Sequence, residues 1–272
     1  MSKQILLIND MAGYGKVALS AMIPVLSHMK HHIYNLPTAL VSNTLDYGKF
    51  DILETTDYMA NTMKVWDELG FSFDAVSTGF IVSERQEELV AGFCEQQKAR
   101  GTKIFVDPIM GDEGKLYNGV TETTISHMRR LVRVADYIVP NYTEAAYLTG
   151  EAYKEDGMTP EEADRLIGKL LEIGAKSIVI TSAVIDRNEA VIVYDYDQKK
   201  KTILPFTSIP VRFPGTGDIF SSVFMGKIME ETNLVESTQK AMDATKAMIA
   251  MNRDNADKFK GIPLESCLEV LD

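Results

Sequence analysis

The sequence predicts an α/β fold in which helices cover both faces of a mostly parallel sheet. Short apolar runs of strand length alternate with longer helical patterns along most of the 272 residues, and this order is typical of such sheets. The chain contains no internal repeat and no linker rich in Pro, Gly or Ser. We therefore predict a single domain over residues 1–272.

The expected elements follow from hydrophobic spacing. Strands are expected where short apolar runs are bounded by polar or turn residues, at 5–8, 33–37, 75–78, 103–106, 137–139 and 177–181. Helices are expected where apolar residues recur at helical spacing, at 17–29, 55–69, 83–99, 121–132, 160–173, 219–230 and 235–251. The helix at 160 has the strongest start, because Thr159 is a cap residue and Pro160 suits the first helical position. Two strand-like runs around the polar segment 197–200 predict an antiparallel hairpin at the sheet edge.

Composition limits the function. The 39 acidic and 28 basic side chains give a formal net charge of −11, which argues against nucleic acid or an anionic membrane as the main partner. No apolar run approaches the roughly 20 residues that a membrane-spanning helix needs, and the first ten residues contain too short an apolar core for a signal peptide. Cys94 and Cys267 each lie in a helical apolar pattern, so we expect buried free thiols in a reducing cytoplasm.

The most informative motif is Phe-Pro-Gly-Thr-Gly-Asp-Ile at residues 213–219. It places Gly215, Thr216 and Gly217 directly before Asp218 and an apolar helical pattern. The free N–H groups and the positive dipole end of a helix start form a site for phosphate, and a carboxylate at its rim could accept a proton from an alcohol. The alternative is an ordinary turn in which Asp218 only caps the helix.

Other polar clusters follow the ends of separate strands. Asp107 and Asp112 flank a turn that contains Pro108 and could serve Mg²⁺, which prefers oxygen ligands, although a capped loop would show the same residues. Asn141 and Glu144 lie three apart, where they could hold metal-bound water, but Asn at a helix start with Glu three residues later is also a common capping pair. Because ligands bind beyond the carboxyl ends of strands in such sheets, these coincidences favour a functional site over separate turns.

Two further segments complete the pattern. The hydroxyls of Thr181 and Ser182 follow the strand at 177–181 and could contact a nucleotide. Residues 9–16 follow the first strand and contain Gly13 and Gly15, whose backbone can approach a ligand closely. This segment is not a P-loop. It satisfies a dinucleotide-binding variant, but the second strand ends in Leu-Pro-Thr and lacks the acidic residue that would hold the ribose.

On these motifs the chain resembles the pyridoxal kinase family of the ribokinase-like superfamily, over nearly its whole length. The resemblance rests on an ordered set of segments: 13–15, 42–43, 47–49, 107–112, 140–144, 181–182 and 212–218. It implies a three-layer ribokinase-like fold, with ATP-dependent phosphorylation of the 5′-hydroxymethyl group of pyridoxal, pyridoxamine or pyridoxine. It also implies ATP with Mg²⁺ as cofactors, with a possible monovalent-cation requirement, and a cytoplasmic homodimer with small-molecule partners.

The resemblance also assigns roles. Asp218 would be the base, with Gly215, Thr216 and Gly217 as the anion hole for the γ-phosphate. The residues implied for ATP are Asp107, Asn141, Glu144, Thr181, Ser182 and Arg212, and those implied for metal are Asp112 and Glu144. Substrate contacts would come from Asp10, Gly15, Ser42, Leu45, Tyr47 and Asp218.

The chain departs from the family pattern at two substrate-side positions. The family carries a serine where this chain has Asp10 and a threonine near Leu45. We expect the carboxylate of Asp10 to favour a cationic substrate, such as a pyridinium or an aminomethyl group, through a charge-assisted hydrogen bond; the alternative is that Asp10 caps the first helix. Rival functions are a hydroxymethylpyrimidine kinase, a sugar or nucleoside kinase of the same fold, a non-catalytic nucleotide-binding protein and a dinucleotide-dependent enzyme.

Overall fold

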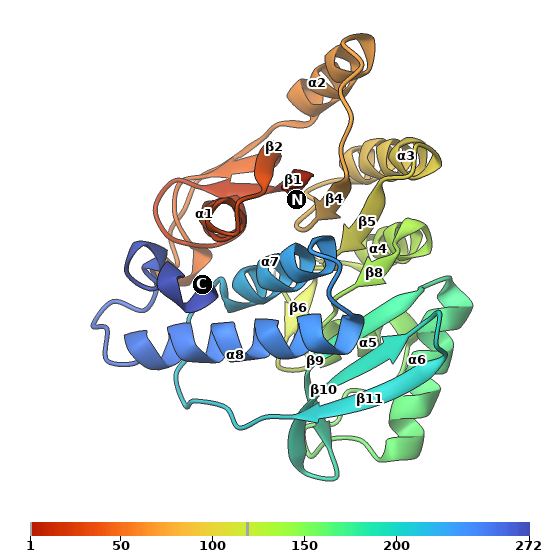
Figure 1. The fold of residues 1–272 in the computed structure, drawn as a ribbon, viewed down its shortest axis with the longest axis vertical. Coiled ribbons are helices and arrows are strands. Elements are labelled where there is room, and N and C mark those ends of the chain that lie inside the picture. The colour runs from red at the N-terminus through yellow and green to blue at the C-terminus, as the bar shows by residue number, and fades with distance from the viewer. Residues whose placement is uncertain (1, 118–119) are drawn as a thin grey trace. The chain divides into compact units, whose positions relative to one another are not determined.

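Residues 2–117 and 120–272 are described by a computed structural model (Figure 1). The chain forms two compact units. Unit 1 contains residues 1–82 and 208–272, and unit 2 contains residues 83–207. Both units combine a sheet with surrounding helices, which confirms the predicted α/β class. The single domain stays a prediction.

The sheet of unit 1 has the strand order β4-β1-β2-β3. Its strands are β1 (Gln4–Ala12), β2 (His32–Val41), β3 (Ile52–Glu54) and β4 (Ala75–Thr78). The central strand β1 runs parallel to β2 and β4, and β3 pairs antiparallel with β2. Residues 5–8 of β1 are completely buried, as expected of an apolar run in the middle of a parallel sheet.

The helices of unit 1 are α1 (Leu19–His28), α2 (Thr56–Glu68), α7 (Thr216–Met229) and α8 (Leu234–Asn252). Helix α7 packs against α1 and α8. It is apolar on nearly all sides, since ten of its residues are buried. A helix of this kind belongs to the core, and its fixed position determines where its first turn lies.

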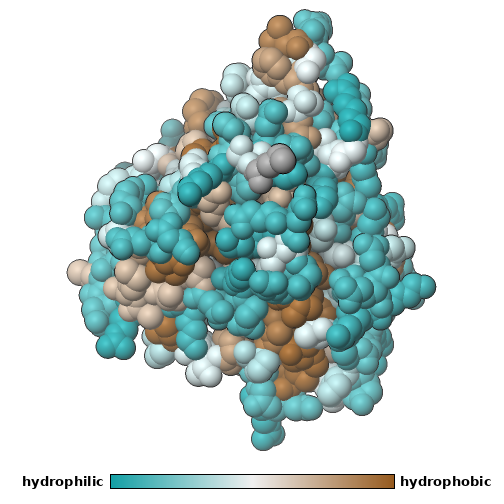
Figure 2. All heavy atoms as spheres, in the orientation of Figure 1, coloured by the Kyte–Doolittle hydropathy of each residue, from teal (hydrophilic) through white to brown (hydrophobic). Residues whose placement is uncertain are grey.

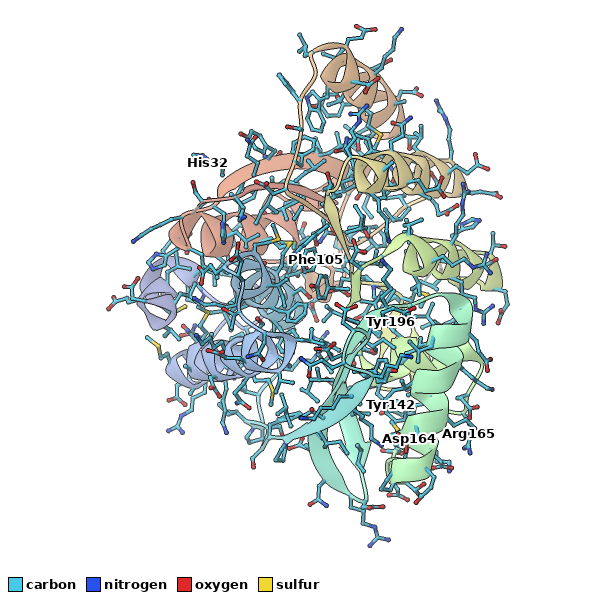
Figure 3. The ribbon with its side chains drawn as sticks, turned by 45° about the vertical axis from the view of Figure 1, so that its right-hand side comes forward. His32, Phe105, Tyr142, Asp164, Arg165 and Tyr196 are labelled. Atoms are coloured by element: carbon cyan, nitrogen blue, oxygen red, sulfur yellow. The ribbon has the colours of Figure 1, made fainter. Side chains whose placement is uncertain are left out.

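Unit 2 has the strand order β11-β10-β9-β8-β5. Its strands are β5 (Lys103–Val106), β8 (Tyr137–Ile138), β9 (Ser177–Ile185), β10 (Asn188–Asp195) and β11 (Lys200–Pro205). The first three run parallel. Phe105 of β5, labelled in Figure 3, stacks on its register partner Tyr137 of β8 with ring centroids 4.8 Å apart. Strands β10 and β11 pair antiparallel, which confirms the predicted edge hairpin.

Four helices and a short ribbon complete unit 2. The helices are α3 (Glu84–Ala99), α4 (Glu122–Val134), α5 (Tyr142–Thr149) and α6 (Pro160–Ile173). Strands β6 (Gly111–Asp112) and β7 (Lys115–Leu116) form a separate two-stranded ribbon. Helix α6, which carries Asp164 and Arg165 (Figure 3), starts as predicted, with a capping box between Thr159 and Glu162.

Several boundaries differ from the sequence predictions. Strand β2 continues to Val41 and so does not end in the Leu-Pro-Thr of residues 36–38. Three other differences concern strands or helices that carry predicted site residues. Strand β1 extends to Ala12 rather than Ile8, because Met11 and Ala12 continue the pairing with β2 beyond a bulge. Strand β9 continues to Ile185, so Thr181 and Ser182 lie within it rather than after it. Helix α7 begins at Thr216, three residues earlier than predicted, because Gly215 adopts the left-handed conformation that ends the preceding turn.

The surface agrees with the acidic composition. The face drawn in Figure 2 is largely hydrophilic, with separate apolar patches. Among the helices in the described part of the chain, none is both long and apolar enough to cross a membrane.

Candidate active site

Asp218 lies in the first turn of α7, three residues after the N-cap Gly215. Its carboxylate does not cap its own helix, whose N-cap makes no side-chain hydrogen bond. Instead, Oδ2 accepts a hydrogen bond of 2.8 Å from the backbone N–H of Ala18, a residue 200 positions away in the sequence. The interpretation of Asp218 as an ordinary cap is therefore wrong.

Ala18 makes this contact from an unusual backbone conformation, with φ 48° and ψ −133°. Side chains with a Cβ rarely occupy this region, and such strain persists only where the surrounding structure enforces it. Ala18 is buried and is the N-cap of α1. Sequence reasoning did not identify it, because alanine gives no signal of a positive φ.

The environment of Asp218 raises its pKa to about 6. Burial is the main cause, and it is opposed by hydrogen bonds from the Ala18 N–H and the Asn9 side chain. The carboxylate is thus ionised at neutral pH but is more basic than an exposed aspartate. A pKa near the operating pH is what a general base requires.

The anion hole is built by the residues before Asp218. Gly215 has φ 85°, and a Cβ at this position would lie 2.2 Å from the carbonyl oxygen of Lys16. Only glycine fits this turn, which directs the chain into the first turn of α7. The backbone N–H groups of Thr216, Gly217 and Asp218 precede the first intrahelical hydrogen bond, which Ile219 donates to Gly215. Such N–H groups and the helix dipole form a site for an anion.

Asp10 lies in β1, where it is half-buried. It does not cap α1, since the N-cap of that helix is Ala18, so the alternative interpretation of Asp10 as a cap is wrong. Its pKa is raised to about 7, mainly by burial and secondly by the negative charge of Asp218. Unit 1 therefore brings the two predicted carboxylates within electrostatic range of each other.

Tyr47, one of the predicted substrate residues, belongs to an aromatic cluster in unit 1 that consists of Tyr14, Tyr47 and Phe259. The ring centroids of Tyr14 and Tyr47 are 6.0 Å apart, and those of Tyr47 and Phe259 are 5.5 Å apart. The Tyr47 hydroxyl donates to Asp257 at 2.7 Å. All three rings are exposed, so they offer an apolar face for a flat ligand. Sequence reasoning missed Phe259, which no motif marks.

The remaining predicted residues of unit 1 are Gly15, Ser42, Leu45 and Arg212. The N–H of Asp51 donates to Ser42 Oγ at 2.9 Å. Leu45 is 52% exposed, and Gly15 lies against the side chain of Thr44. Arg212 pairs with Asp46.

The predicted nucleotide residues of unit 2 centre on Glu144, which is buried at the start of α5. Glu144 and the N-cap Asn141 form a reciprocal capping box, in which Asn141 N–H donates to Oε2 at 2.8 Å and Glu144 N–H donates to Asn141 Oδ1 at 2.9 Å. Oε1 accepts from Met110 N–H at 3.1 Å, and Asn141 Nδ2 donates to Gly111 O at 2.8 Å. These bonds fix the start of α5 to the segment that carries Asp107 and Asp112.

Three carboxylates thus concentrate negative charge in unit 2. The pKa of Glu144 is raised well above its ordinary value, first by burial and then by the charges of Asp107 and Asp112. Within residues 2–117 and 120–272, no group of three or more His, Cys, Asp or Glu side chains has the geometry to hold a metal ion by itself. The oxygen donors suit Mg²⁺ that takes its other ligands from water and phosphate.

Thr181 and Ser182 lie in unit 2 near Asn141. Thr181 N–H donates to Pro140 O at 2.9 Å, and Thr181 forms a parallel bridge with Asn141. Ser182 is exposed and has φ 52°. The backbone of Thr181, one of the two residues whose hydroxyls are predicted to contact the nucleotide, is therefore paired with the segment that carries the Asn141–Glu144 capping box.

Comparison with known proteins gives consistent results. The chain matches the phosphomethylpyrimidine kinase family over residues 19–262. A structure from Bacteroides thetaiotaomicron VPI-5482, described as a phosphomethylpyrimidine kinase and crystallised with pyridoxal, is 33% identical, with a TM-score of 0.93 over 100% of this chain and 96% of that chain.

Pyridoxal kinases are also similar to this chain. The pyridoxal kinase of Lactobacillus plantarum is 26% identical, with a TM-score of 0.89 over 99% of this chain and 96% of that chain. The pyridoxal kinase of Paraburkholderia xenovorans (strain LB400) is 26% identical over 92% of this chain and 86% of that protein. These similarities confirm the resemblance and the fold class predicted from the motifs.

Proposed function

Because the chain belongs to the phosphomethylpyrimidine kinase family, we propose that it is an ATP-dependent kinase that phosphorylates the 5′-hydroxymethyl group of pyridoxal, pyridoxamine or pyridoxine. It is a phosphotransferase with an alcohol acceptor, as are its pyridoxal kinase relatives. One observation supports this function above the others. A carboxylate with a raised pKa lies in the first turn of α7, beside N–H groups that can bind phosphate.

The reaction follows from these groups. The substrate hydroxyl donates its proton to Asp218 as its oxygen forms a bond to the γ-phosphorus, and the bond from that phosphorus to the β–γ bridging oxygen breaks to release ADP. The N–H groups of Thr216 and Gly217 stabilise the negative charge on the transferred phosphoryl oxygens. Positioning and charge stabilisation account for most of the rate in such a transfer.

Asp107, Asp112 and Glu144 would handle Mg²⁺, directly or through water, and the metal would neutralise charge on the ATP phosphates when bound. Each oxygen of Glu144 already accepts a backbone N–H, which favours contact with the metal through water over direct coordination. Asn141, Thr181, Ser182 and Arg212 stay proposed nucleotide contacts. A cytoplasmic location, a homodimer and a monovalent-cation requirement stay proposals that follow from the family resemblance.

A second substrate has its own support, because the matching family is described by phosphomethylpyrimidine. Hydroxymethylpyrimidine offers a similar flat ring with a primary alcohol. Against it stands the similarity to pyridoxal kinases. In addition, the relative described as a phosphomethylpyrimidine kinase was crystallised with pyridoxal. We therefore rank a B6 vitamer first.

An ADP-release screen tests both candidates. The purified protein, ATP and Mg²⁺ are combined with each B6 vitamer, hydroxymethylpyrimidine and common sugars. We expect the highest kcat/KM with a B6 vitamer and a kcat for Asp218→Asn that is lower by about 10²–10⁴-fold. Turnover of hydroxymethylpyrimidine alone would replace the first candidate with the second, and NAD binding without any ADP release would contradict both.

A further inference from the structure

The segment 257–261, which follows α8 in unit 1, packs against the anion hole. Gly261 has φ 75°, and a Cβ at this position would lie 2.6 Å from the carbonyl oxygen of Lys16 and 3.0 Å from that of Pro214. Pro214 directly precedes Gly215, and a Cβ at Gly215 would meet the same Lys16 oxygen at 2.2 Å. The segment is therefore fixed against the turn that forms the anion hole.

Hydrogen bonds to backbone carbonyls also join this segment to the aromatic cluster. The N–H of Lys16 donates to Lys260 O at 2.7 Å, and the Thr44 hydroxyl donates to Phe259 O at 2.6 Å. The N–H of Thr44 in turn donates to Tyr14 O at 3.1 Å. The stretches of chain that supply the aromatic rings are thus joined to one another through their backbones, and the orientation of each ring remains to be explained.

Asp257 fixes the orientation of the Tyr47 ring. Its Oδ2 accepts the Tyr47 hydroxyl at 2.7 Å, and its Oδ1 accepts the backbone N–H of Phe259 at 3.2 Å. One carboxylate thus joins the far end of the Tyr47 ring to the chain that carries Phe259. An exposed tyrosine ring changes rotamer readily when nothing holds it, so this contact preserves the edge-to-face arrangement in which the two rings meet at 89°.

The charges near Asp257 strengthen this contact. The Lys260 ammonium lies 3.6 Å from Asp257 Oδ2 and 5.5 Å from the centroid of the Tyr14 ring. The pKa of Asp257 is lowered, first by the hydrogen bond from Tyr47 and then by the charge of Lys260. The pKa of Tyr47 is raised, first by burial and then by the hydrogen bond to Asp257. At neutral pH a neutral hydroxyl therefore donates to an ionised acceptor, which is a strong type of hydrogen bond.

We propose that Asp257 is a positioning residue for the acceptor, whose carboxylate holds the Tyr47 ring in the orientation in which the aromatic cluster receives the flat ring of the substrate. The identity of the acceptor rests on the proposed function, whereas the contact can be tested without turnover. No motif of the sequence marks Asp257, which reaches Tyr47 from 210 residues away.

The contact is tested by ¹³C NMR of the complete protein labelled at tyrosine Cζ, which follows ionisation of the hydroxyl. The Tyr47 resonance is assigned by its loss in Tyr47→Phe. In Asp257→Ala, loss of the negative charge and of the hydrogen bond from the neutral hydroxyl should lower the Tyr47 pKa by about one pH unit. The matched control is Asp254→Ala, which removes an exposed aspartate paired with the adjacent Arg253; it should leave the Tyr47 pKa unchanged.

Asp257→Asn provides a second variant if Asp257→Ala disorders the segment 257–261. It keeps an oxygen for the Phe259 N–H and removes the negative charge, so it should also lower the Tyr47 pKa. A Tyr47 pKa that is the same as in the wild type in both Asp257 variants would overturn the proposal.

Kinetics then connect the contact to the acceptor. With a B6 vitamer, Asp257→Ala should raise the acceptor KM by about threefold to tenfold, the usual effect of one hydrogen bond, with an unchanged KM for ATP. Because Asp257 acts through the Tyr47 hydroxyl, the double variant with Tyr47→Phe should raise the acceptor KM by much less than the product of the two single effects. Multiplicative effects, or an unchanged acceptor KM in Asp257→Ala, would overturn the proposal. If the wild type phosphorylates no vitamer or pyrimidine, the proposed function fails, and the NMR titration still decides the contact.

Discussion

Asp218 in unit 1 and Glu144 in unit 2 occupy the same position, the third residue of a helix, and have opposite local roles. Glu144 closes a reciprocal capping box with Asn141 and uses its second oxygen for the Met110 N–H. Asp218 follows a glycine N-cap that makes no side-chain hydrogen bond, and its carboxylate turns to Ala18. Both groups have a raised pKa through burial, but only Glu144 caps the helix to which it belongs.

The two carboxylates therefore have different uses: Glu144 stabilises the start of its own helix, whereas Asp218 does not cap its helix. Glu144 satisfies backbone donors that would otherwise be buried without an acceptor, so its main effect should be on stability. Asp218 accepts the N–H of Ala18, whose strained backbone conformation costs stability and is typical of functional sites. Substitution of each residue should therefore affect different measurements.

The largest effect is expected from Asp218→Asn. The amide cannot accept the hydroxyl proton, so kcat should fall by about 10²–10⁴-fold, the usual contribution of a general base. The KM for ATP and the thermal midpoint should change little, because the side chain keeps its shape. Steady-state kinetics with a B6 vitamer measure this, and a kcat within threefold of wild type would show that another group accepts the proton.

The next largest effect is expected from Glu144→Ala. Its removal leaves the N–H groups of Asn141 and Met110 without their acceptor, so the free energy of unfolding should fall by about 2 kcal/mol. Urea denaturation measures this loss. The matched control is Glu162→Ala, which opens the capping box of α6 at a more exposed position and should cost about 0.5–1 kcal/mol.

If Glu144→Ala and Glu162→Ala lowered the free energy of unfolding equally, the buried capping box would not be the more stabilising one, and this prediction would be contradicted. A loss of turnover in Glu144→Ala at full stability would contradict the structural role and would instead support direct handling of the nucleotide.

A smaller effect concerns substrate choice. If Asp10 favours a cationic acceptor, Asp10→Ser should lower the ratio of kcat/KM for pyridoxamine to that for pyridoxal by about tenfold, since hydrogen bonds to charged groups contribute roughly 1.5–3 kcal/mol. The matched control is Ser20→Ala, which removes a unit 1 hydroxyl that donates to Ala12 O at 2.6 Å and should leave the ratio unchanged. An unchanged ratio in Asp10→Ser would rule out this role.

These residues also show how far sequence reasoning reaches. The alternation of strands and helices, the edge hairpin and the capping box at 159–162 were predictable, because each depends on residues close in sequence. The sequence allowed Asp218 to be either a base or a helix cap. It could not exclude the cap, because the partner of the carboxylate is Ala18, 200 residues away. The positive φ of Ala18 could not be predicted, because it is a consequence of tertiary packing.

The predicted end of β1 and the predicted start of α7 were wrong for the same reason. The apolar run ends at Ile8, yet β1 continues to Ala12 because β2 supplies pairing partners beyond the bulge. Helix α7 starts at Thr216 because Lys16 and Gly215 approach too closely for any side chain. In both places a neighbour that is distant in sequence determines the local conformation.

The smallest expected effect is a pH-dependent gain in stability from Asp10→Asn. The pKa of Asp10 is about 7 in the folded protein against an ordinary value of 3.8, so the folded state binds this proton more tightly than the unfolded state. Stability contributed by the protonated group is therefore lost as pH rises from about 4 through 7.

Asp10→Asn removes this loss and should be more stable than wild type by about 1 kcal/mol at pH 8, after discounting for partial exposure. The difference should shrink toward pH 4 and vanish only below the ordinary value of 3.8, where Asp10 is protonated in both states of the wild type. Unfolding in urea at pH 4.5, 6 and 8 measures it, and a wild type that is the more stable protein at pH 8 would show that a cationic partner, rather than burial, controls Asp10.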